Sequence, residues 1–114
     1  MHEQSHGEAF LAIFSHDLNS QTRSIFLLDE PENALSPSRQ LAFLGILRNL
    51  EESGNAQAIV ATHSPILLSY PSATLYSFDA GRIEKTSLEA TEHYRVTRAF
   101  LTNPDKYLAE IFGD

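Results

Sequence analysis

Residues 24–37, SIFLLDEPENALSP, carry the clearest signals of secondary structure in this chain. Its first part, the apolar run 24–28, is short and does not alternate with polar residues, as is typical of a parallel strand covered on both faces. The run is bounded by Asp29-Glu30-Pro31. Ser36 followed by Pro37 is a helix N-cap with proline in the first turn, so we expect a helix to follow the strand.

A helix, a second strand and a second capped helix are predicted to follow the first strand. Four leucines recur with a helical period before Ser53-Gly54-Asn55 ends the helix: Leu41, Leu44, Leu47 and Leu50. A second apolar run, 58–61, predicts another strand, and Ser64-Pro65 caps a short helix that extends through Leu68. Strand, helix and strand in this order predict an α/β fold with a short, mostly parallel sheet and a right-handed crossover.

The flanking segments complete the predicted architecture. Residues 7–18 carry a helical apolar stripe, and Ser5-His6-Gly7-Glu8 forms a Ser-x-x-Glu capping box at its start. Residues 74–79 and 82–86 predict a β-hairpin on the margin of the sheet. The remainder, over 91–112, is predicted to be helical with a break at Asn103-Pro104.

Composition narrows the class of protein. The 114 residues predict a single domain, and the balance of 8 Lys plus Arg against 15 Asp plus Glu gives a net charge of −7. This charge disfavours binding of nucleic acid through the phosphate backbone. The absence of cysteine excludes disulfides and thiolate metal sites. The apolar runs are too short for a membrane span and the start of the chain is polar, so we expect a cytoplasmic protein.

Polar side chains stand directly after both predicted strands. Asp29 and Glu30 follow the first strand and Thr62-His63 the second, and ligands of open α/β sheets bind beyond the carboxyl ends of such strands. Asp29 has the chemistry to hold a divalent cation, Glu30 to orient or deprotonate water, and His63 to donate a hydrogen bond to developing negative charge. Together these roles describe hydrolysis of a phosphoanhydride.

Simpler interpretations of the same residues stay open at this point. Asp-Glu-Pro after an apolar run is also an ordinary turn, and His63 before a Ser-Pro cap can be satisfied by local backbone groups. A third interpretation is a carboxylate metal hydrolase that uses Asp29, Glu30 and Asp79, which would bind Mg²⁺ or Mn²⁺ without nucleotide.

The order of the motifs resembles one known family, the ATP-binding cassette ATPases of the P-loop superfamily, in particular their soluble branch grouped with AAA-type domains. Ser5-His6-Gly7-Glu8 resembles the signature motif, although His6 and Glu8 depart from the usual Ser-Gly-Gly-Gln. Residues 25–30 resemble the Walker B strand with its glutamate, 33–36 the D-loop, and His63 the switch histidine.

The resemblance implies roles for individual residues, with ATP and Mg²⁺ as cofactors. Asp29 would support Mg²⁺, Glu30 would polarise the attacking water, and His63 would sense the terminal phosphate. The family's signature segment closes over ATP held by the opposite subunit, which would place Ser5 and Gly7 against that nucleotide. Asn33, in the D-loop-like segment, would lie at the subunit boundary.

One part of the family's nucleotide site has no counterpart in the sequence. Gly-x-x-x-x-Gly-Lys-Ser/Thr does not occur, and the lysines are Lys85 and Lys106. We therefore expect residues 1–114 to form a single partial domain, the C-terminal half of such an ATPase, inactive alone. Its expected partners are ATP and either a second copy in a homodimer or a complementing N-terminal half. The alternative is a non-catalytic remnant or interaction module that dimerises with or regulates a complete ATPase.

Overall fold

The computed structural model describes residues 23–78 and 81–114, and the chain divides into two compact units. We call Met1–Tyr70 the β–α–β unit and Pro71–Asp114 the C-terminal unit. The predicted helix over 7–18 and its capping box lie outside the described residues. The prediction of a single partial domain stays a prediction, and each unit is described by itself.

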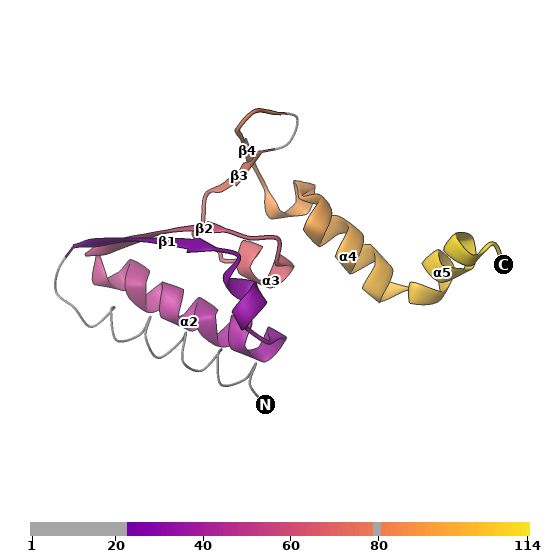
Figure 1. Ribbon diagram of the computed structural model, residues 1–114, viewed down its shortest axis with the longest axis horizontal. Helices are drawn as coiled ribbons and strands as arrows, with labels where there is room; N and C mark the ends of the chain where they lie inside the picture. The colour runs from indigo at the N-terminus through magenta and orange to yellow at the C-terminus, as the bar shows by residue number, and fades with distance from the viewer. Residues whose placement is uncertain (1–22, 79–80) are drawn as a thin grey trace. The chain divides into compact units, whose positions relative to one another are not determined.

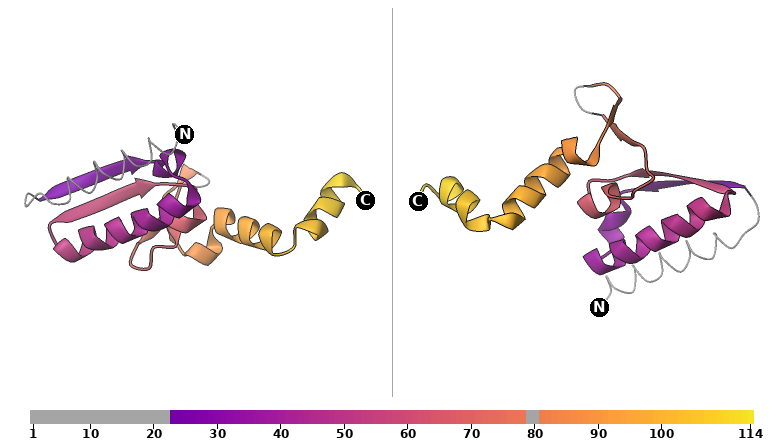
Figure 2. Two further views of the ribbon diagram at one scale, coloured as in Figure 1. Left: turned by 90° about the horizontal axis from the view of Figure 1, so that it is seen from below. Right: turned by 180° about the vertical axis from the view of Figure 1, so that it is seen from behind.

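The β–α–β unit is built on two parallel strands, as predicted. β1 (Ser24–Asp29) pairs with β2 (Ala56–Ala61) along its whole length, in a register that sets Asp29 opposite Ala61. The 17-residue helix α2 (Pro37–Ser53) connects the strands and runs along one face of the pair (Figures 1 and 2). This mixed α/β arrangement with a short parallel sheet is compatible with part of a P-loop domain.

Helix α2 begins and ends at the predicted residues. The Ser36 hydroxyl accepts a hydrogen bond from the Arg39 amide at 3.3 Å, and Gly54 ends the helix with φ of 71°, a conformation that favours glycine. The buried face runs through Phe43 and Leu50, whereas Leu41 is 59% exposed. The helix predicted from the leucine period is confirmed: Leu44, Leu47 and Leu50 contact the core, whereas Leu41 falls outside the arc that faces the sheet.

The core lies on the side of the strands that α2 covers. Four buried hydrophobic residues form it: Leu35, Phe43, Leu50 and Leu67. Phe26 and Leu28 of β1 pack against this cluster, whereas their neighbours Ile25 and Leu27 are 66% and 74% exposed. Among the described residues, the predicted burial of β1 on two faces is thus found on one face, since α2 covers only that side.

Two hydrogen bonds of one buried side chain, Gln40, connect the start of α2 with the turn that follows β2. The side-chain Nε2 of Gln40 donates to the backbone carbonyl of Leu35 at 3.2 Å, and the Ser64 hydroxyl donates to the side-chain Oε1 of Gln40. Ser64 also caps α3 (Pro65–Leu68) by accepting from the Leu67 amide at 3.3 Å, which confirms the predicted cap. The start of α2 is therefore fixed to the turn that follows β2.

The C-terminal unit consists of a hairpin and helices. β3 (Leu75–Ser77) and β4 (Glu84–Thr86) pair antiparallel as predicted, but they form a two-stranded sheet of their own. The one-turn helix η3 (Leu88–Ala90) precedes α4 (Glu92–Thr102) and α5 (Pro104–Phe112), which are interrupted at Asn103 as predicted. Within the described ranges, no helix has the length and apolar character required to cross a membrane.

Candidate functional site

The candidate site begins where β1 ends. Glu30 continues the ladder, because its amide donates to the Ala61 carbonyl at 2.7 Å, but its φ of 48° and ψ of 55° are left-handed. Over 23–78 and 81–114 it is the sole non-glycine residue with positive φ. Pro31 disfavours the right-handed helical region for the residue before it, and the short helix η1 (Pro31–Ala34) starts immediately afterwards. Such a conformation costs energy and is concentrated at functional sites.

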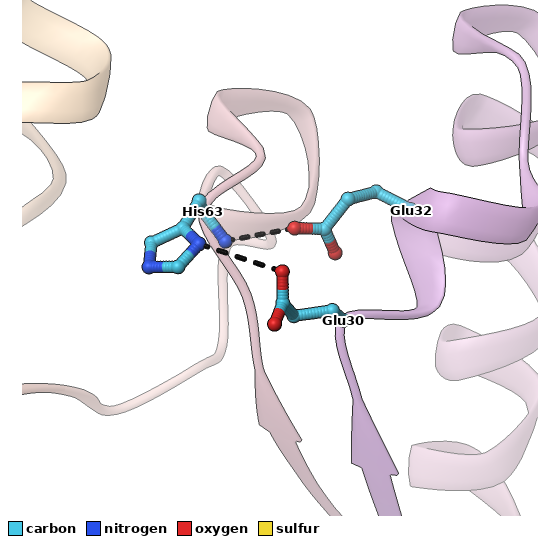
Figure 3. A group of neighbouring side chains, drawn as sticks. All are labelled: Glu30, Glu32 and His63. Atoms are coloured by element: carbon cyan, nitrogen blue, oxygen red, sulfur yellow. Dashed lines mark hydrogen bonds and ion pairs between the residues drawn. The ribbon is translucent and has the colours of Figure 1, made fainter.

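The structure brings Glu30 and His63 together from the ends of the two parallel strands. The imidazole Nδ1 of His63 lies 3.8 Å from Oε1 of Glu30 (Figure 3). This distance is too long for a direct hydrogen bond but suits an ion pair when the imidazole is protonated. The side chains are 44% exposed at Glu30 and 68% exposed at His63, so a ligand from solvent can reach both.

Glu32, which the sequence analysis did not single out, links the two strand ends. Its Oε1 accepts a hydrogen bond from the Thr62 hydroxyl at 2.6 Å, and its Oε2 accepts one from the His63 amide at 2.9 Å. The Ser64 amide in turn donates to the Thr62 hydroxyl oxygen at 3.0 Å. One signal for Glu32 was present in the sequence: an acidic residue in a proline-initiated turn directly after Glu30.

The environment of Glu32 changes the pKa of its carboxyl group. Partial burial raises the pKa, but the hydrogen bonds from Thr62 and from the His63 amide, together with the nearby imidazole charge, outweigh this effect. The net result is a pKa below the ordinary value of 4.5. Glu32 is therefore an anion at neutral pH, which is the form that accepts both hydrogen bonds.

The cluster has the donor set of a cation site. One ligand atom each from Glu30, Glu32 and His63 lies within 4.8 Å of the others. Asp29, which we expected to hold the metal, is exposed at the end of β1 and is not a member of this group. Carboxylate oxygens suit Mg²⁺, and the imidazole extends the set to transition metals.

The other predicted site residues are placed as follows. Asn33 is exposed in η1, and its amide donates to the Glu30 carbonyl at 3.0 Å, which closes the turn that carries Glu30. Ser5 and Gly7 of the signature-like segment lie outside the described residues, as does Asp79 of the metal-hydrolase interpretation. Their roles stay predictions.

Comparisons with known proteins point to one family. Protein ea59 of Escherichia phage lambda is 48% identical over 46 residues, which are 40% of this chain and 9% of that protein, so the match spans less than a tenth of the relative. No solved structure matches the chain significantly. The family described as "AAA domain, putative AbiEii toxin, Type IV TA system" matches residues 9–69, which include β1, α2, β2 and the Glu30–His63 cluster. Because this match covers more than half of the sequence, the chain belongs to that family of AAA-type, P-loop ATPase domains.

Proposed function

We propose that this chain supplies the hydrolytic residues of an ATPase of the ATP-binding cassette type. The observation that carries the proposal is the approach of the Glu30 carboxylate to the His63 imidazole, 3.8 Å apart at the carboxyl ends of two parallel strands. In open α/β sheets this edge is the place where ligands bind. Membership of an AAA-type family supports a nucleotide as the ligand.

In this proposal each of three residues has one task. Glu30 accepts a hydrogen bond from the attacking water and orients it, and the exposed carboxylate leaves room for that water. His63 donates a hydrogen bond to the terminal phosphate; the ring nitrogen not paired with Glu30 is directed away from both carboxylates (Figure 3). Asp29 supports Mg²⁺, directly or through water, and Mg²⁺ supplies neutralisation of phosphate charge when bound.

The phosphate-binding loop of such an ATPase has no counterpart in this sequence. Gly-x-x-x-x-Gly-Lys-Ser/Thr does not occur, and neither Lys85 nor Lys106 follows a glycine in that way. We therefore propose that a complementing N-terminal half supplies that loop. Ser5, Gly7 and Asn33 would then face the nucleotide and the boundary of the opposite subunit.

The test is the substitution Glu30→Gln in a complex of this chain with a polypeptide that carries the phosphate loop. The change removes the carboxylate that orients water but keeps the size of the side chain. We expect phosphate release to fall by roughly 10²-fold or more, the range for loss of a general base. ATP binding, measured by calorimetry, should be retained.

The matched control is Glu52→Gln, because Glu52 is an exposed glutamate of α2 whose contact is an ion pair with Arg48. This control should leave phosphate release unchanged. Equal turnover by the Glu30→Gln complex and the unmodified complex would overturn the proposal. It would favour the alternative, a non-catalytic module that dimerises with or regulates a complete ATPase.

A further inference from the structure

Both carboxylate oxygens of Glu32 accept hydrogen bonds from a segment distant in sequence. Its two carboxylate oxygens accept from two donors one residue apart in sequence, the Thr62 hydroxyl and the His63 amide. The donors lie 30 and 31 residues further along the chain, so these bonds are tertiary contacts. They connect the turn after β1 to the turn after β2.

The chemistry of the contact requires a carboxylate. Both partners are donors, so both oxygens of the side chain must accept. Glutamine would offer one accepting oxygen and one donating NH₂ group, and therefore could keep only one of the two bonds. Hydrogen bonds to a charged acceptor are also stronger than those to a neutral one, and charge-assisted bonds fix geometry more tightly.

The bond to the His63 amide determines where the imidazole can be. Residue 63 lies outside the β2 ladder, and its side chain is 68% exposed, so packing alone holds the ring weakly. Fixing the peptide of His63 restricts the position of its Cα and therefore the reach of the ring toward Glu30. Figure 3 shows both carboxylates directed toward His63, one at its backbone and one at its ring.

We propose that Glu32 is a positioning residue for His63, which holds the segment after β2 so that the imidazole faces the Glu30 carboxylate. This inference rests on the proposed function for its catalytic consequence, because the position of His63 matters for hydrolysis only if His63 contacts the phosphate. Its structural content, the coupling of residues 30, 32 and 63, can be measured without turnover.

The first measurement uses the full chain and NMR. Glu32→Ala should accelerate hydrogen exchange of the His63 amide by about tenfold, since a bond to a charged acceptor is worth at least that factor. Glu32→Gln, with one acceptor left, should fall between Glu32→Ala and the unmodified chain. Thr62→Val should retain protection at His63, because it removes only the hydroxyl donor. Glu52→Ala, an exposed glutamate to alanine change elsewhere in the same unit, should have no effect on this amide.

The second measurement separates positioning from a general loss of stability. In the unmodified chain, Glu30→Gln should shift the imidazole resonances of His63, because the two side chains are in contact. In the Glu32→Ala background, Glu30→Gln should shift the imidazole resonances of His63 much less. The amide chemical shifts of β1 and α2 should stay unchanged, which shows that the unit is still folded. An imidazole that responds equally to Glu30→Gln in both backgrounds would overturn the proposal. If Glu32→Ala does not fold, Glu32→Gln serves in its place, with the same criterion.

The third measurement is the rate of ATP hydrolysis by the complex, which tests whether the position of His63 affects catalysis. Glu32→Ala should lower kcat by roughly tenfold to a hundredfold, as displaced catalytic groups do, with KM for ATP changed less than about twofold. Unchanged kcat together with loss of coupling at His63 would leave the positioning role standing and remove the proposed contact of His63 with the terminal phosphate. Retained coupling with reduced kcat would remove the positioning role and leave the ATPase proposal standing.

Discussion

The two units of this chain reach ordered structure by different means. In the β–α–β unit, the described elements enclose a core with Phe43 completely buried, and side chains such as Glu32 and Gln40 join segments distant in sequence. The C-terminal unit contains no buried residue in its described ranges, and large apolar side chains such as Leu101 and Phe112 are 66% and 67% exposed. Its helices are instead fixed by local caps.

Of the two units, the β–α–β unit has the packing that a functional site requires. A catalytic geometry requires side chains whose positions are determined by several independent contacts, and only the β–α–β unit shows these among the described residues. Capped helices without a core of their own are stabilised mainly by local interactions, which are marginal for such lengths. The C-terminal unit therefore gives a reference against which the site-bearing unit can be tested.

The largest loss of stability is expected when the buried ring of Phe43 is removed. Phe43→Ala removes a ring with 0% exposure and should destabilise the β–α–β unit by about 3–5 kcal/mol. Phe100→Ala, in the C-terminal unit, removes a half-buried ring that meets Tyr107 edge to face at 6.2 Å, so its cost should be about 1 kcal/mol. Urea unfolding followed by hydrogen exchange at amides of each unit measures both. Equal costs would show that the two units do not differ in packing.

A smaller effect is expected from pH. The pKa of Glu32 is lower in the folded chain than its ordinary value of 4.5, so the unfolded chain binds a proton more readily at this position. The stability contributed by Glu32 should thus be complete above pH 4.5 and be lost as pH falls through the lower folded value. In the Glu32→Gln variant, the stability of the β–α–β unit should depend less on pH. The urea concentration at the midpoint of unfolding, measured at several acid pH values, tests this. A pH dependence of the same steepness in that variant would contradict the assignment.

The comparison also explains what could be predicted from the sequence. Caps and breaks are local, so Ser36, Gly54, Ser64 and Asn103 located the helix ends in both units. The parallel pairing of β1 and β2 followed from the order of elements. The meeting of Glu30 and His63 followed from the rule that parallel strands end at a common edge.

Tertiary context decided the remainder. The burial of Phe43 depends on the angle at which α2 meets the sheet, which the helical period of the leucines alone does not give. The role of Glu32 depends on the left-handed conformation of Glu30, which turns the chain after β1 back toward residues 62 and 63. Pro31 signals a turn but does not specify the left-handed conformation of Glu30, and an acidic residue in a short helix is also a common solvated side chain.

The smallest expected effect concerns Tyr70, the last residue of the β–α–β unit. Its hydroxyl donates to Oε1 of Glu51 at 2.6 Å, and desolvation together with this bond and the Glu51 charge raises the pKa of Tyr70 to about 12. Since the folded value exceeds the ordinary value of 10.0, the stabilisation should be complete below pH 10 and be lost as pH rises toward 12. The difference in phenolate absorbance between the unmodified chain and Tyr70→Phe isolates this titration. Glu51→Gln should lower the titration midpoint of Tyr70, because the charge that disfavours the phenolate is gone. A midpoint already near 10 in the unmodified chain would show that Tyr70 and Glu51 are not paired in solution.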